Sequence, residues 1–303
     1  MEQQPRLVED HIRKNKRDTV LICMFMGVLL FGVILAIGIV LDTPPLFTTL
    51  VALPVVLVYI LITYSFSVQS VISAARARPA DPNNRDERLL MNKVDEMATA
   101  AGLPTPKVYV QDSHDINAFA TGHKPEDSII CATTGAIQKL NSEELEGVIG
   151  HEMSHIMNRD TLVMTVTVGV VGAIALLSEI ILYSLFWGGA GGNRRDRGGG
   201  GIILVIIGIV FIVLAPIFSR LTYLAISRRR EYLADADGAY LTRNPEGLAK
   251  ALEKIEADIP DDPKGSKTVA PLYIVNPFKR ALRDSIWSTH PPLDERIRRL
   301  RSM

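Results

Sequence analysis

The sequence predicts a mainly α-helical membrane protein in which two polar segments form an α+β domain on one membrane face. A bilayer core of about 30 Å needs about 20 helical residues to cross it. Four stretches reach that length with no charge, or with Glu179 alone; they are residues 20–41, 46–75, 161–187 and 198–219. We therefore expect four hydrophobic helices, with spans at about 20–41, 46–68, 161–187 and 198–219.

These stretches divide the chain into alternating membrane and polar parts. A basic tail and the first two spans make up residues 1–75, and the second pair of spans makes up residues 161–227. The polar parts are residues 76–160 and 228–303. We expect these two polar parts to fold together as the α+β domain, and the Gly- and Arg-rich residues 188–201 to form a loop between spans three and four.

The first apolar stretch has an alternative interpretation as a secretory signal peptide. Basic residues precede it, as they do in signal peptides. The apolar run is too long, however, and no small-residue cleavage site follows. We interpret it as a retained membrane anchor.

The positions of basic residues predict the orientation of the spans. The tail, the junction at 76–88 and the run at 228–230 all place Lys or Arg at span ends, which favours the cytoplasmic side. An even number of crossings puts all three on that side. The arginines within 188–201 would then lie on the opposite side, unless spans three and four form a re-entrant pair.

Composition excludes several other classes of protein. Basic and acidic residues balance at 33 each, so no general attraction to nucleic acid is expected. The two cysteines, Cys23 in the first span and Cys131 in a polar part, are too few for a Cys-based zinc site. We expect no disulfide between them.

The motif H-E-x-x-H at residues 151–155 carries the chemistry. Positions four apart lie on one face of a helix, so His151 and His155 can bind one zinc ion. Glu152 is adjacent and can take a proton from water activated by the metal. Asn141, followed by acidic residues, predicts the start of this helix. A chance occurrence of the motif remains the alternative.

A third zinc ligand is needed, because catalytic zinc sites usually have three protein ligands. Glu231 follows the fourth span, and Asp235 stands one helical turn later. This is the arrangement of thermolysin-like zinc enzymes. Glu231 would bind the zinc, and Asp235 would accept the free N–H of a ligand histidine, His151 in our interpretation. The alternative is a solvated helix face beside the arginines at 228–230.

With these motifs in place, the chain resembles the HtpX-type membrane zinc metalloproteases, relatives of the CAAX prenyl proteases. The resemblance rests on residues 151–160, on the E-Y-L-A-D motif at 231–235, on S-T-H-P-P at 288–292 with E-R-I at 295–297, and on N-A-F-A-T-G at 117–122. It implies a zincin-like (gluzincin) domain facing the cytoplasm of a prokaryotic cell, one zinc ion per chain, and peptide or protein substrates, in particular membrane proteins.

The resemblance also implies roles that spacing does not. Asn117, Ala118, Phe119 and Ala120 would lie on or near an edge strand that holds an extended substrate by strand addition. The residues themselves suggest strands only weakly, at 107–110 and 128–131. His290 would stabilise the oxyanion of the tetrahedral intermediate; without the resemblance it is equally well a residue at a helix entry.

The mechanism expected is metal-assisted peptide hydrolysis. Zinc held by His151, His155 and Glu231 would polarise the scissile carbonyl, and Glu152 would move a proton from water to the leaving amine. The expected role is quality control of misfolded membrane proteins. Three alternatives are a prenyl-protein processing protease, a catalytically silent metal-binding membrane scaffold, and a transporter, although a transporter would leave the hydrolase motifs unexplained.

Overall fold

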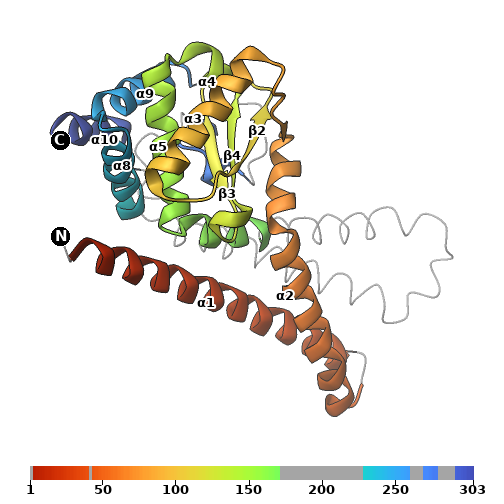
Figure 1. Ribbon diagram of the computed structural model, residues 1–303. Helices are drawn as coiled ribbons and strands as arrows, with labels where there is room; N and C mark the ends of the chain where they lie inside the picture. The colour runs from red at the N-terminus through yellow and green to blue at the C-terminus, as the bar shows by residue number, and fades with distance from the viewer. Residues whose placement is uncertain (1–2, 41–42, 171–227, 260–268, 279–290) are drawn as a thin grey trace.

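A computed structural model describes residues 3–40, 43–170, 228–259, 269–278 and 291–303 (Figure 1). The predicted third span, 161–187, is described as far as residue 170. Its remainder, the predicted fourth span at 198–219, the loop at 188–201 and Glu179 lie outside the described residues. The described elements are mostly helical, with one small sheet. They are α1 (Gln3–Val40), α2 (Pro45–Ala75), β1 (Arg78–Pro79), α3 (Arg85–Ala101), β2 (Lys107–Gln111), β3 (Ala118–Thr121), η1 (Pro125–Asp127), β4 (Ile129–Thr133), α4 (Thr134–Lys139), α5 (Ser142–Met157), the helix Asp160–Val170, α8 (Arg228–Thr242), α9 (Pro245–Ala257), η2 (Ala270–Leu272) and α10 (Leu293–Arg301).

Helices α1 and α2 hold the first two predicted spans. The basic tail and the first apolar stretch form one continuous helix, α1, which runs along the lower side of the sheet-containing part and meets α2 at its far end (Figure 1). Pro45 is the first residue of α2. A backbone N–H at this position has no partner within the helix, so proline loses no hydrogen bond there. Within the described ranges, α2 is the one helix long and apolar enough to cross a membrane. The four-span arrangement therefore stays a prediction.

The sheet has the strand order β1-β2-β4-β3. β2 and β4 are parallel, whereas β1 and β3 pair antiparallel to their neighbours. The weak strand signals at 107–110 and 128–131 are thus confirmed as β2 and β4. β3, which holds most of the residues 117–121, is an edge strand of this mixed sheet.

Side chains alternate between the two faces of the sheet and join two separate hydrophobic clusters. Ala118 and Ala120 of β3, with Ile130 of β4, belong to the larger cluster, which includes residues of α3, α5, α9 and α10. Phe119 and Cys131 face the other cluster, which includes the last residues of α2 and the helix Asp160–Val170. The apolar helix α2 therefore continues directly into the core beside the sheet.

Candidate metal centre and active site

A reciprocal cap begins α5, the helix that carries the H-E-x-x-H motif. The side chain of Asn141 accepts a hydrogen bond from the backbone N–H of Glu144 at 2.9 Å, and the Glu144 carboxylate accepts one from the N–H of Asn141 at 2.8 Å. This capping box satisfies two N–H groups that a helix start otherwise leaves unpaired. The helix start predicted at Asn141 is confirmed, and with it the shared face of His151 and His155.

Two glycines let α8 approach α5 closely enough to bring in Glu231. A Cβ atom added to Gly238 would lie 2.8 Å from the backbone N of His151, and one added to Gly150 would lie 3.1 Å from the backbone O of Gly238. Only hydrogen side chains fit at both positions. Gly150 and Gly238 therefore allow close packing of the two helices, and the contact fixes α8 beside the histidines.

His151, His155 and Glu231 meet in one buried group. Their candidate ligand atoms all lie within 4.8 Å of one another. Nε2 of His151 is 3.9 Å and Nε2 of His155 is 3.7 Å from carboxylate oxygens of Glu231. A tetrahedral ion with ligands at about 2.0–2.1 Å places them about 3.3–3.4 Å apart. The group is thus close to the size that a zinc ion requires.

Buried polar atoms in this group also fit a metal. Nε2 of His151 has no hydrogen-bond partner within the part of the chain that the structure describes, nor does Oε1 of Glu152. A buried polar atom without a partner costs about 1–3 kcal/mol. A cation bound by His151, with water against Glu152, would satisfy both atoms.

Asp235 holds the other nitrogen of His151 and is itself held by Arg296. Oδ1 of Asp235 is 3.0 Å from Nδ1 of His151. The Arg296 guanidinium donates two hydrogen bonds to Asp235, at 2.7 and 2.8 Å, and a third to the backbone O of Ile274 at 3.0 Å. All three side chains are almost fully buried. Such partners fix the tautomer and direction of a ligand histidine.

Asp160 does the same for the second histidine. Its Oδ2 lies 3.1 Å from Nδ1 of His155, and both side chains are buried. Asp160 begins the helix that follows α5, after a turn in which Arg159 has a positive φ of 59°. Both histidines thus present Nε2 to the common centre, with Nδ1 held by a carboxylate.

The charges of the site favour a bound cation. Burial raises the pKa of Glu152 to about 7, and the nearby charge of Glu231 adds to this. Burial also opposes a charge on His155, yet the hydrogen bond with Asp160 and the charge of Glu231 outweigh it and raise the pKa of His155 to about 9. Burial lowers the pKa of His151, and Arg296 contributes to this. The buried carboxylates of Asp160, Glu231 and Glu152 thus favour a positive charge among them.

The edge of β3 that faces away from β4 lies beside Glu152. The backbone N–H of Ala120 donates a hydrogen bond to the Glu152 carboxylate. The backbone O of Ala118 accepts one from the N–H of Ile274 at 2.9 Å. The side chain of Asn117 donates to the backbone O of Val275 at 2.8 Å, so it braces the segment 269–278 against the strand.

The sequence left two buried residues of the site without a role. Asp160 belongs to the matching stretch 151–160 but received no role, although a carboxylate five residues after the second histidine is a usable signal. Arg296 was noted within a motif, without a role. Leu293, Ile297 and Leu300 form the inner face of α10, and helical spacing places Arg296 on that same face, where a charge requires a partner. His290 lies outside the described residues.

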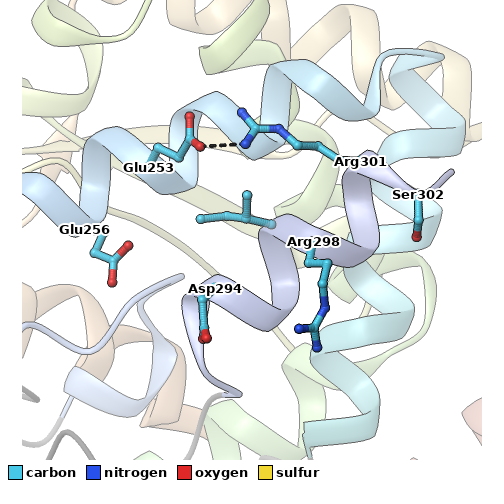
Figure 2. Close-up of a pocket in the computed structure, with 7 residues that line it drawn as sticks. Glu253, Glu256, Asp294, Arg298, Arg301 and Ser302 are labelled. Carbon is cyan, nitrogen blue, oxygen red and sulfur yellow. Dashed lines mark ion pairs between the residues drawn. The ribbon is translucent and has the colours of Figure 1, made fainter.

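A separate surface cavity does not contain this chemistry. It has a volume of about 530 Å3, lies between α9 and α10, and carries charges that pair with one another, as Glu253 and Arg301 do at 2.8 Å (Figure 2). None of the metal-site residues lines it. Its lining residues are Glu253, Glu256, Asp294, Ile297, Arg298, Arg301 and Ser302.

A helix carrying H-E-x-x-H, a buried glutamate from a second helix and an edge strand beside them define the site of a metallopeptidase. Residues 84–303 match the family model described as Peptidase family M48. The chain belongs to this family and is a metalloprotease.

Curated relatives agree over most of the chain. A "Protease HtpX homolog" of Thermoanaerobacter pseudethanolicus is 44% identical over 249 residues, which are 82% of this chain and 82% of the relative. Another, of Streptococcus agalactiae serotype III, is 41% identical over 298 residues, which are 98% of this chain and 100% of the relative. The expected resemblance to HtpX-type proteases is confirmed.

A solved structure shares the fold. The crystal structure of S. mikatae Ste24p aligns with a TM-score of 0.51 and 20% sequence identity over 96% of this chain. The match covers 66% of that longer chain, just under two thirds of its length. At this identity the comparison supports the fold alone.

Proposed function

We propose that the chain is a zinc-dependent endopeptidase of the membrane, with one zinc ion held by His151, His155 and Glu231. The buried group that these three residues form, within 4.8 Å and beside Glu152, carries the proposal. Two imidazoles and one carboxylate are the ligand set of several catalytic zinc sites, which keep the fourth position open. Zinc would polarise the scissile carbonyl and acidify water.

Glu152 would act as the general base and then as the general acid. A carboxylate with a pKa near the working pH can both take a proton from water and return it to the leaving amine. Burial raises the pKa of Glu152 to about 7, toward the working pH, and the charge of a bound zinc ion would lower it again. Its position next to His151 on α5 keeps it beside the ligands. His290, just before the described chain resumes at Pro291, is our proposal for the oxyanion donor.

We propose that β3 binds substrate through its main chain. The Phe119 side chain is buried in the cluster beside α2, so it is not available to contact substrate. The outward-facing groups belong to Ala118 and Ala120, and both already have partners within the chain, Ile274 and Glu152. An entering strand would therefore exchange these bonds for its own. The Asn117 side chain would position segment 269–278 rather than touch substrate.

Placement in the membrane rests on the apolar helices and on the relatives. α2 exposes many large apolar side chains, among them Leu46, Phe47 and Leu50, as a lipid-facing helix would. We propose four crossings, with both polar parts on the cytoplasmic face, so that Glu231 returns to the face that carries His151. The relatives with full-length matches are named proteases, which supports protein or peptide substrates, and we propose misfolded membrane proteins among these.

The test compares the purified chain with its Glu152→Gln variant in detergent, each with one equivalent of zinc. A destabilised membrane protein and a prenylated peptide serve as alternative substrates. We expect the wild-type chain to cleave the membrane protein and the variant to cleave neither while retaining zinc. Cleavage of the prenylated peptide alone would favour a prenyl-protein processing protease. Zinc binding without any cleavage by the wild type would favour a silent scaffold.

A further inference from the structure

The tail that precedes the first apolar stretch reaches the metal site through Asn15. This residue lies in α1 and its side chain is 1% exposed, although its neighbours Lys14 and Lys16 are exposed. The side-chain amide donates to the backbone O of Asn158 at 2.9 Å and to Oδ1 of Asp160 at 2.8 Å. Both partners only accept, so the amide nitrogen must face them.

The two oxygens of Asp160 have different tasks. Oδ1 accepts from Asn15, and Oδ2 lies 3.1 Å from Nδ1 of His155. A hydrogen bond to one oxygen restricts the rotation of the whole carboxylate, and therefore the position of its other oxygen. Asn15 therefore fixes the direction from which Asp160 meets the imidazole ring of His155.

A second contact joins α1 to the same place. Nε of Arg230 lies 3.4 Å from Oδ1 of Asp160, and Nη2 of Arg230 lies 3.5 Å from Asp18, one turn along α1 from Asn15. Arg230 directly precedes Glu231. The residues of α1 that face the catalytic part thus meet Asp160, the partner of His155, and Arg230, the residue next to Glu231.

We propose that Asn15 is a positioning residue of the metal centre, acting through Asp160 on His155, so that α1 forms part of the zinc site as well as a membrane anchor. The inference rests on the proposed zinc site. Residues that orient a ligand histidine typically contribute about 10- to 100-fold to metal affinity. Asn15 acts one step further away, so we expect its loss to weaken zinc binding by about tenfold, the low end of this range.

The experiment measures zinc affinity by competition with a chromogenic chelator. The variants are Asn15→Leu, the near-isosteric Asn15→Asp, Asp160→Ala and the double variant Asn15→Leu/Asp160→Ala, and Lys16→Leu on the exposed side of α1 is the matched control. We expect both Asn15 variants to bind zinc more weakly and the control to match the wild type. The double variant should bind no more weakly than Asp160→Ala alone, because Asn15 acts on His155 through Asp160.

A merely structural role of Asn15 would give a different pattern. It would lower the unfolding temperature of the metal-free protein and leave the visible spectrum of the cobalt-substituted protein unchanged. We expect the cobalt spectrum of Asn15→Asp to change, because the ligand geometry at His155 changes. Unchanged zinc affinity in both Asn15 variants, or independent losses in the double variant, would overturn the inference. A wild-type chain that binds no zinc would instead overturn the proposed function.

Discussion

Replacing Arg296 by methionine should destabilise the protein far more than any exposed arginine would. Arg296 is fully buried and donates two hydrogen bonds to Asp235, which is 2% exposed. Without the guanidinium, Asp235 is a buried charge whose remaining partner among the described residues is the neutral His151. Breaking a buried ion pair from one side costs about 3–5 kcal/mol. At about 2–4 °C per kcal/mol for a chain of this size class, the unfolding temperature should fall by roughly 6–20 °C.

The assay is thermal unfolding of the metal-free protein in detergent at a fixed heating rate, because unfolding of such proteins is often irreversible. Arg298→Met is the matched control, since the Arg298 side chain is 75% exposed and its pairing with Glu295 lies at the surface. Adding Asp235→Asn to Arg296→Met removes the stranded charge and should recover part of the loss. Equal shifts for Arg296→Met and Arg298→Met, or no recovery in the double variant, would refute the reasoning.

Three further predictions follow from the same site. Gly238→Ala should lower the unfolding temperature and weaken zinc binding, because the added Cβ would lie 2.8 Å from the backbone N of His151. Gly32→Ala is the control and should change neither quantity, because a Cβ there has no neighbouring atom within 4 Å. Equal effects of the two substitutions would contradict the packing argument. Glu152→Gln should stabilise the metal-free protein above pH 7 by roughly 3 kcal/mol. The pKa of Glu152 is about 7 in the folded state and 4.5 ordinarily, so the wild type loses stability as the pH rises from about 4.5 to about 7. Equal unfolding temperatures of the variant and the wild type at pH 8 would contradict this prediction. Zinc affinity should rise roughly tenfold per pH unit up to about pH 9, because zinc displaces a proton from His155, whose pKa is raised to about 9. A zinc affinity that does not change between pH 7 and 9, measured by chelator competition, would contradict the raised pKa of His155.

Local sequence patterns predicted the parts of the site that depend on one helix. The four-residue spacing of His151 and His155 and the cap at Asn141 needed only the geometry of α5. Glu231 could be proposed because a zinc site needs a third ligand, and its helix also predicted that Asp235 stands one turn further. The structure brings these residues together as that reasoning expected.

Residues that depend on distant segments could not be predicted in this way. Arg296 reaches Asp235 from the last helix, and Asn15 reaches Asp160 from the first. No local periodicity relates residues so far apart in the chain. The sequence shows the tail around Asn15 only as a basic stretch before the first span, and a single asparagine among basic residues forms no pattern that predicts its burial. The edge position of β3 likewise depends on pairing with β4 and came from the resemblance.

The central claim is that one zinc ion held by two histidines and Glu231 makes this chain a peptidase with Glu152 as its base. The most direct test titrates metal-stripped protein with zinc and measures bound zinc and peptide cleavage on the same samples. In the wild type, both should saturate together at one zinc ion per chain. In Glu152→Gln, zinc should saturate without cleavage, and in Glu231→Ala, zinc binding should be lost. Cleavage by the metal-free protein, or full cleavage by Glu152→Gln, would contradict the account.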